Sequence, residues 1–150
     1  MEMNPVVHFE MGAKDKKRMV EFYSSVFGWQ TQQMGPEMGE YIVVTTSETD
    51  KDRMVKKPGT INGGFYQKTD DPGSHAPSIV ISVDDIRASM KAVEKAGGKI
   101  LGAMNESGKH MLEPQEIPGV GLWISFQDTE GNRVSMLQPA IMPKTKKRLN

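Results

Sequence analysis

The chain of 150 residues contains no cysteine. Disulfide bonds, thiolate nucleophiles and zinc sites built from sulfur are therefore excluded. The chain also lacks a charge excess, because 19 Lys and Arg balance 19 Asp and Glu. A balanced chain has no general electrostatic attraction to nucleic acid or to an anionic membrane surface.

Long apolar runs are missing as well. No window approaches the roughly 20 apolar residues of a membrane span. The N-terminus "MEMNPVV" lacks the basic region followed by an apolar stretch that marks a secretory signal. We therefore expect a cytoplasmic protein that contacts neither nucleic acid nor membrane.

What is present fits one soluble globular domain. A hydrophobic fraction of 37% in 150 residues is ordinary for such a domain and sufficient for a real core. The stretch "PKTKKRLN" at the C-terminus is the one basic run, and it is typical of a solvated tail. We expect a single domain over residues 1–141 and a flexible basic tail over 142–150.

The main sequence feature is an internal repeat. "VVHFEMGAKDKKRMVEFYSSVFGW" and "SIVISVDDIRASMKAVEKAGGK" share a layout under a shift of about 70 positions. Each copy starts with a strand pattern, continues with a helical pattern and stops at glycine. Shorter β-like runs follow both copies. The sequence thus predicts an α+β fold of two βαβββ modules, over about 4–68 and 77–139.

Local signals define both helices. Met19, Phe22, Tyr23 and Val26 recur at helical spacing, and Ile86, Met90 and Val93 repeat the pattern. Asp15, and Asp84 or Asp85, can accept the free amides of a first turn; Gly28, and Gly97 or Gly98, suit a left-handed stop. We expect both apolar stripes to be core. Gly131 is expected to have a positive φ in the last hairpin.

The order of these motifs resembles a known family. "NPVVHFEM" with "EFYSSVFGW", "INGGF", "SVDDI" with "KAGGK", and "EIPGVGLWISFQDTEGNRVSMLQP" are similar to the vicinal oxygen chelate superfamily, which includes glyoxalase I, bleomycin-resistance proteins and extradiol dioxygenases. The greatest similarity is to its bacterial branch related to lactoylglutathione lyase. The resemblance implies paired modules that form a half-barrel around a cleft, and frequent homodimers.

Metal-using members of that superfamily hold a divalent ion at inward-facing positions, where it acts as a Lewis acid. The resemblance places His8, Ser78 and Ser135 at three of these positions, and the fourth strand "INGGFY" offers no carboxylate or imidazole. One imidazole with neutral hydroxyls is a poor donor set for a divalent ion. We therefore predict no metal and no other cofactor.

His8 and Glu10 are the candidate catalytic residues. They are two apart on a predicted strand, so their side chains leave the same face. The imidazole would act as a base near neutral pH, with its pKa raised and its ring oriented by the carboxylate. The alternative is an interior histidine with a structural glutamate.

Four further residues are candidates for ligand binding: Phe65, Ser78, Trp123 and Ser135. The hydroxyls can bond a substrate carbonyl, and the rings can stack on a planar ligand, although ordinary packing explains either. At most one of Trp123 and Phe126 faces the pocket, because their spacing is odd. His110, Glu113 and Glu116 lie in an expected long loop that could fold over the cleft and supply a ligand or a base, although such residues are usually solvated.

Three functions follow. The first is a metal-independent isomerase or lyase that acts on a small carbonyl or vicinal-oxygen compound through His8 and Glu10. The second is a protein of the bleomycin-resistance type, which binds a small molecule without a reaction. The third, a metal-dependent lactoylglutathione lyase, is disfavoured by the poor donor set. Fold alone does not decide among them.

Overall fold

A computed structural model describes residues 2–105 and 107–140. The predicted basic tail at 142–150 lies outside these residues. No helix of the described part of the chain is long and apolar enough to cross a membrane.

Two copies of one βαβββ arrangement follow each other along the chain. The first consists of β1 (Val6–Ala13), α1 (Lys16–Phe27), β2 (Gln30–Gln33), β3 (Ile42–Thr45) and β4 (Asn62–Gln67). The second consists of β5 (Ser78–Ser82), α2 (Ile86–Lys95), β6 (Lys99–Met104), β9 (Gly121–Gln127) and β10 (Arg133–Pro139). Short 3-10 turns, η1 (Pro36–Met38) and η2 (Pro72–His75), lie in the connections. The predicted α+β class and duplicated modules are confirmed.

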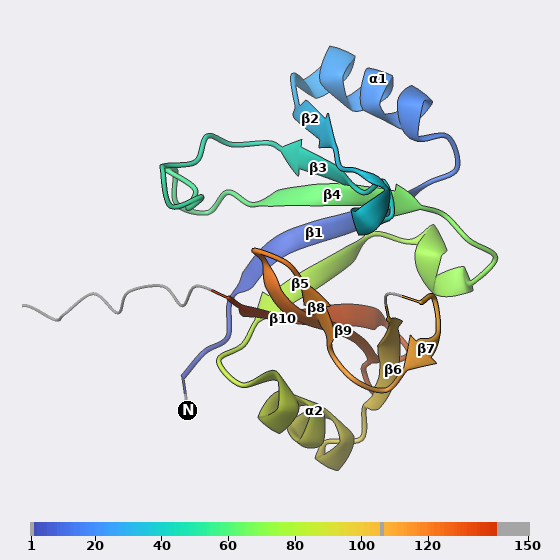
Figure 1. Cartoon of the computed structure of the whole chain (residues 1–150). Helices are drawn as coiled ribbons and strands as arrows, with labels where there is room; N and C mark the ends of the chain where they lie inside the picture. The colour runs from blue at the N-terminus through green and yellow to red at the C-terminus, as the bar shows by residue number, and fades with distance from the viewer. Residues whose placement is uncertain (1, 106, 141–150) are drawn as a thin grey trace, which may run out of the picture.

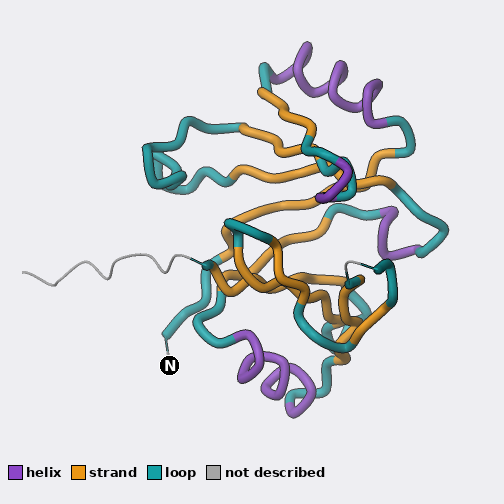
Figure 2. Tube along the Cα trace, viewed as in Figure 1, coloured by secondary structure: helices purple, strands orange, loops and turns teal. Residues whose placement is uncertain are grey.

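The modules join edge to edge. The described strands form one sheet in the order β2-β3-β4-β1-β5-β10-β9-β6-β7, in which β7 is His110–Met111. The strand β8 (Gln115–Ile117) pairs with β9. The seam between the modules is the antiparallel pair β1–β5, while β1–β4 and β5–β10 are parallel pairs. Figure 1 shows α1 at one end of the molecule and α2 at the other, with the curved sheet between them. Figure 2 shows the strands gathered in the middle of the molecule.

Local chemistry explains where the helices start and stop. The Asp15 side chain accepts a hydrogen bond from the Arg18 amide, and the Asp85 side chain accepts one from the Ala88 amide. Gly28 ends α1 in the left-handed region, with φ 69°. Gly97 has φ 96° just after α2, and Gly131 has φ 86° in the last hairpin, as predicted.

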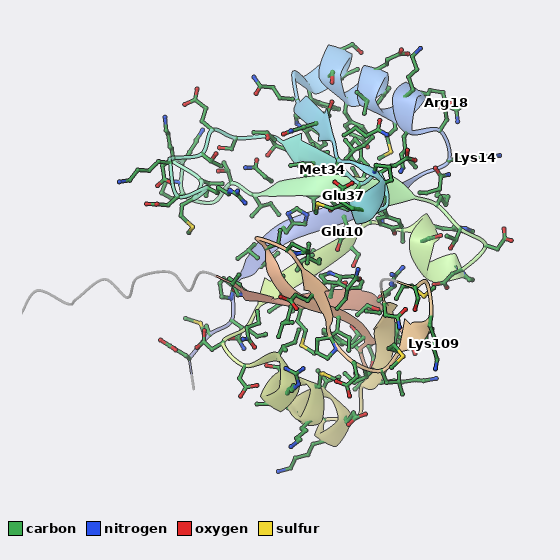
Figure 3. All side chains as sticks on the ribbon, in the orientation of Figure 1. Glu10, Lys14, Arg18, Met34, Glu37 and Lys109 are labelled. Atoms are coloured by element: carbon green, nitrogen blue, oxygen red, sulfur yellow. The ribbon has the colours of Figure 1, made fainter. Side chains whose placement is uncertain are left out.

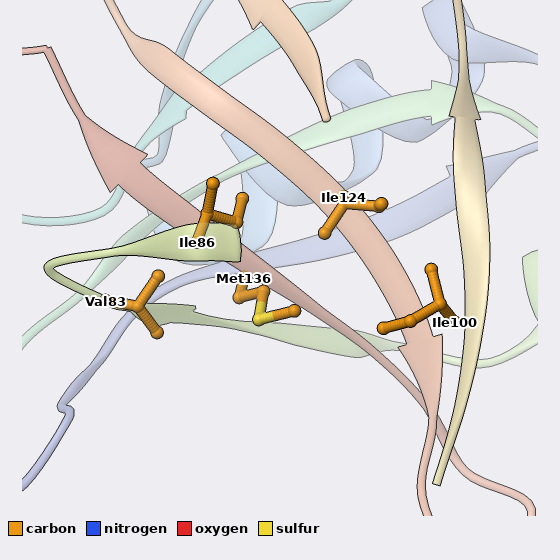
Figure 4. Packing of buried hydrophobic residues seen from close by; sticks show 5 residues of the cluster. All are labelled: Val83, Ile86, Ile100, Ile124 and Met136. Atoms are coloured by element: carbon orange, nitrogen blue, oxygen red, sulfur yellow. The ribbon is translucent and has the colours of Figure 1, made fainter. Parts of the chain in front are cut away.

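Each helix covers one cluster on the outer face of the sheet. Under α2, Ile86 packs against strand residues that include Ile124 and Met136, and the five buried side chains of this cluster meet in Figure 4. Under α1, the buried residues are Ile42, Val44 and Phe65. The partly buried side chains that pack against this second cluster are those of Phe9, Met11, Met19, Val20, Tyr23 and Trp29.

One part of the predicted core is wrong. Met19 and Tyr23 pack inward, but Phe22 is 55% exposed and Val26 is 57% exposed. The helix touches the sheet along a narrower stripe than the sequence pattern suggested, so two of the predicted core residues point away from it. The stripe of α2 behaves as predicted, because Ile86, Met90 and Val93 all belong to its cluster.

The expected long loop after β6 contains short strands. β7 (His110–Met111) pairs with β6, and β8 pairs with β9. The His110 ring nitrogen Nε2 bonds the Leu101 carbonyl, while Glu113 and Glu116 are exposed. This segment is therefore attached to the edge of the second module by backbone pairing, and His110 has a structural partner.

Candidate functional site

The inner face of the sheet, opposite the helices, carries the candidate residues. Phe9 and Met11 of β1 pack under α1, so the alternating residues His8 and Glu10 leave the other face. The same alternation on β4 sends Phe65 to the core and Gly64 and Tyr66 to the inner face. On β10, Met136 faces α2, which leaves Arg133 and Ser135 on the inner face.

His8 and Glu10 are joined through a third residue that the sequence analysis did not identify. The Tyr41 hydroxyl lies 3.0 Å from His8 Nε2 and donates to Glu10 Oε2 at 3.4 Å. A hydroxyl carries one proton, so a Tyr41 that donates to Glu10 must accept from His8. In that arrangement His8 Nε2 carries the proton of the hydrogen bond to Tyr41. The two predicted partners do not contact each other directly in this arrangement.

Gly64 makes room for this bridge. It pairs with Glu10 across β1 and β4, and a Cβ atom at position 64 would collide with the ring and hydroxyl of Tyr41. Tyr41 precedes β3, so its side chain must cross β4 to reach β1. Only a residue without a side chain leaves that path open. The sequence signal for this close approach is the "GG" of "INGGF", which does not identify Tyr41.

Burial dominates the electrostatics of the group. It lowers the pKa of His8 from 6.5 to about 4, because the charged imidazolium loses its hydration. The predicted rise in the pKa of His8 is therefore wrong. Burial raises the pKa of Glu10, opposed by hydrogen bonds from Trp123 and Tyr41 and by the charge of Arg133. Burial also raises the pKa of Tyr41, reinforced by the nearby Glu10 charge. The acid–base character thus rests on Glu10.

Both modules contribute to the surroundings of Glu10. Tyr41 comes from the first module, while Trp123 and Arg133 come from β9 and β10 of the second. Glu10 lies near the middle of the molecule in Figure 3, on the strand that forms the seam. Its side chain and that of His8 both keep part of their surface accessible. A small molecule that reaches the inner face therefore meets a carboxyl group that residues of both modules surround.

The remaining sequence candidates separate into two groups. Trp123 lies beside Glu10, as a ligand-facing aromatic would, while Phe126 packs into the cluster under α2. Phe65 has no exposed surface and belongs to the core under α1, so it lies on the opposite face of the sheet from Glu10. Its placement follows from strand alternation, since Met11 is its cross-strand partner.

Ser78 and Ser135 both lie on the inner face. Ser78 pairs with Glu10 across β1 and β5, and its hydroxyl donates to the Arg133 carbonyl at 3.0 Å. Ser135 is 3% exposed and pairs with Val80, the cross-strand partner of His8. Ser78 is therefore occupied by an internal hydrogen bond, and Ser135 has almost no surface to offer a ligand.

Two surface depressions lie away from this group. One of about 550 Å³ is lined by Lys14, Lys68, Thr69, Asp70 and His75. Another of about 280 Å³ is lined by Lys17, Val20, Thr31, Gln33 and Ile42. Neither depression is lined by His8, Glu10 or Tyr41.

A family model for the glyoxalase/bleomycin resistance protein/dioxygenase superfamily matches residues 6–136. The chain belongs to this superfamily. The match spans both modules, from β1 to β10. The resemblance inferred from the sequence is therefore confirmed.

Relatives within the superfamily are similar at different levels. A glyoxylase-like domain-containing protein of Didymella fabae is 33% identical over 125 residues, covering 82% of this chain and 84% of the relative. The anthracycline biosynthesis protein DnrV of Streptomyces peucetius is 24% identical over 141 residues, covering 89% of this chain and 46% of the relative. The chain therefore spans about half the length of DnrV.

Solved structures agree in fold. Methylmalonyl-CoA epimerase of Streptomyces coelicolor, in complex with 2-nitronate-propionyl-CoA, has a TM-score of 0.62 at 14% identity, covering 93% of this chain and all of that one (100%). A superfamily member from Vibrio splendidus has a TM-score of 0.55 at 17% identity, covering 91% and 99%. At these identities the likeness shows the shared architecture alone.

The residues at the superfamily's metal-binding positions do not fit a divalent ion. His8 Nε2 is engaged by Tyr41, position 64 has no side chain, and the Ser78 hydroxyl is engaged by Arg133. Asn62, the remaining polar residue of β4 in that region, accepts hydrogen bonds from the Thr46 and Ser47 amides. Within residues 2–105 and 107–140, no group of three or more His, Asp or Glu side chains could hold a metal ion. One imidazole with neutral side chains lacks the further charged and nitrogen ligands that offset dehydration of such an ion.

Proposed function

We propose that the protein binds a small carbonyl compound on the inner face of its sheet and moves a proton on the carbon next to the carbonyl group. Glu10 accepts this proton and returns it, so the reaction is an isomerisation of the substrate. The observation that supports the proposal is a partly accessible carboxyl group at the seam of the two modules, with its pKa raised by burial.

A raised pKa suits this role. A carboxylate that binds a proton more tightly than an ordinary glutamate is a stronger base, and it can hold the proton long enough to return it. The Tyr41 hydroxyl donates to the carboxylate, and the nearby Trp123 and Arg133 help Tyr41 keep it ionised more than burial alone would. His8, neutral and bonded to Tyr41, fixes the direction of the Tyr41 hydroxyl. His8 and Tyr41 are thus positioning residues, and Glu10 is the catalytic residue.

The test is hydrogen–deuterium exchange at the carbon next to the carbonyl group, followed by NMR in D₂O across a panel of small aldehydes, ketones and 2-oxo acids. Wild-type protein is expected to exchange at least one compound, and Glu10→Gln is expected to abolish that exchange. Glu116→Gln is the matched control, because Glu116 is exposed and lies on a different strand. Exchange that survives in Glu10→Gln would refute the assigned base.

A binding protein without catalysis is the second candidate. It is favoured by the hydrogen bonds of His8, Tyr41 and Glu10, which already satisfy one another without a ligand. Saturable binding of a compound with no exchange in any member of the panel would support it. The homodimer and the cytoplasmic location stay predictions, and sedimentation velocity and fractionation of cells test them.

A further inference from the structure

The Tyr66 hydroxyl stands out on the inner face. Across residues 2–105 and 107–140, it is the buried side-chain polar atom for which the structure provides no hydrogen-bond partner. Tyr66 is the second residue after Gly64 on β4, so its side chain leaves the same face as Glu10. An unpaired buried hydroxyl costs folding free energy. A partner that the chain does not supply would remove that cost.

A positive charge lies close to the same place. The Ser78 hydroxyl donates to the Arg133 carbonyl, and Ser78 pairs with Glu10. Glu10, Ser78 and Arg133 thus form a row across β1, β5 and β10. Burial raises the pKa of both Glu10 and Tyr66, and the Arg133 charge opposes this rise in each case.

Arg133 forms a long ion pair. Its nearest ion-pair partner is Asp71, at 4.0 Å, and the Asp71 side chain is 65% exposed. An exposed pair at that separation is weak, and water screens it. The Arg133 side chain is only 28% exposed, so its charge acts with less screening toward the interior. The inner face therefore combines an unpaired hydrogen-bond donor with a cation whose ion pair to Asp71 is long and exposed.

We propose that the Tyr66 hydroxyl and the Arg133 guanidinium bind the substrate oxygen that becomes negative while Glu10 holds the proton. This inference rests on the proposed function. The substrate is then a carbonyl compound that reacts through its enolate. The C–H bond breaks and its electron pair forms a carbon–carbon double bond, while the carbonyl π pair moves onto the oxygen. The proton goes to Glu10, and its return to carbon restores the carbonyl group.

The arrangement suits this chemistry because the charges are complementary at the moment of reaction. A neutral carbonyl oxygen gains little from a guanidinium group, whereas an enolate oxygen gains a charge-assisted hydrogen bond and an opposite charge. The Tyr66 oxygen is covered in the structure, so the neighbouring side chains must shift when the ligand enters. The ligand oxygen then supplies the partner that the hydroxyl lacks.

The experiment uses oxalate, a planar dianion that imitates an enolate next to a carboxylate. Isothermal titration calorimetry on the full chain compares wild type with Tyr66→Phe and Arg133→Gln. We expect oxalate to bind wild type and to lose about tenfold or more in affinity in each variant. Tyr23→Phe is the matched control, since Tyr23 belongs to α1 and packs against the other face of the sheet. Its affinity for oxalate should equal that of wild type.

Thermal unfolding supplies a second readout. Removing an unpaired hydroxyl leaves the ligand-free protein as stable as wild type or more so. Tyr66→Phe should therefore keep or raise the midpoint temperature of unfolding, and it should weaken oxalate binding. A purely structural tyrosine would instead lose stability and leave affinity unchanged.

The outcomes separate this inference from the proposed function. Equal oxalate affinity in wild type and Tyr66→Phe, or no binding to wild type, overturns the inference even if Glu10-dependent exchange is observed. Oxalate binding that needs Tyr66 and Arg133, without exchange in any carbonyl compound, supports the anion site and rejects the proton transfer. Glu10→Gln should bind oxalate at least as tightly as wild type, because a negative charge next to the anion is removed.

Discussion

Tyr41 occupies the space that a Cβ atom at position 64 would fill, so the hydroxyl bridge between His8 and Glu10 depends on Gly64. The dependence runs across two strand boundaries, because Tyr41 precedes β3 and reaches over β4 to β1. The absence of a side chain at position 64 is therefore a requirement for this arrangement of His8, Tyr41 and Glu10.

Gly64→Ala is expected to destabilise the protein by about 1–3 kcal/mol, since the added methyl group forces Tyr41 out of its place. Urea denaturation followed by tryptophan fluorescence measures the change. A double-mutant cycle provides the control: in a Tyr41→Ala background, the same substitution should cost much less. Equal costs in both backgrounds would show that Tyr41 is not the obstacle.

Tyr41→Phe is expected to raise the pKa of Glu10 further. The Tyr41 hydroxyl donates to the carboxylate, and this hydrogen bond favours the ionised form. Without this hydrogen bond, less opposes burial, which raises the pKa of Glu10. NMR of ¹³C-labelled glutamate side chains should show the titration of Glu10 at higher pH in the variant. A titration that stays in place or moves to lower pH would contradict the assigned hydrogen bond.

Because of His8, the free energy of unfolding is expected to fall as the pH is lowered from 6.5 toward about 4. Its pKa is about 4 in the folded state and 6.5 for the free side chain, so the unfolded chain binds the proton more tightly. The stabilisation is present above pH 6.5 and is lost as the pH falls toward about 4. His8→Gln should flatten the dependence of the unfolding free energy on pH in that window, by at most about 3 kcal/mol. A profile with the wild-type slope would contradict the burial of a neutral imidazole.

Glu10 is expected to change the stability of the fold with pH in the direction opposite to His8. Burial raises its pKa, so the folded state binds this proton more tightly, and stability is lost as the pH rises through the folded-state pKa. Glu10→Gln should therefore unfold at higher denaturant concentration than wild type at neutral pH, while it loses proton exchange. Denaturation curves at acid and neutral pH measure the effect. A variant less stable than wild type at neutral pH would show that ionised Glu10 supports the fold.

Phe65→Ala should act on stability alone. Phe65 has no exposed surface and packs with Ile42 and Val44 under α1. The cavity left by its removal should lower the free energy of unfolding by about 3–5 kcal/mol. Val43→Ala, at a residue 36% exposed on the neighbouring strand, is the control and should cost far less. Ligand affinity, measured on the folded fraction, should equal that of wild type. A large change in affinity would bring Phe65 back as a ligand-binding residue.

The sequence predicted the elements better than their contacts. Caps at Asp15 and Asp85 and the glycine at 28 are local signals, because each depends on hydrogen bonds or φ values within a few residues. The face of β1 was also predictable, since strand alternation puts His8 and Glu10 together. These features needed no knowledge of the rest of the chain.

The contacts depend on distant parts of the chain. Nothing in the sequence around Tyr41 indicates that its hydroxyl lies between His8 and Glu10, because the path was opened by a glycine on another strand. The nearness of Trp123 to Glu10 depends on the curvature of a sheet shared by both modules. Periodicity also misplaced Phe22, because it cannot report how much of α1 the sheet covers.

The antiparallel junction of β1 and β5 places the first strands of the two modules side by side. Under the repeat, Glu10 corresponds to Val80, and the pairs Glu10–Gly64 and Val80–Ser135 occupy matching places in the two ladders. The first module therefore has a carboxylate where the second has a buried apolar side chain, since Val80 is 2% exposed. The duplicated sheet is thus asymmetric in its chemistry at these matching places, because the acid comes from the first module alone.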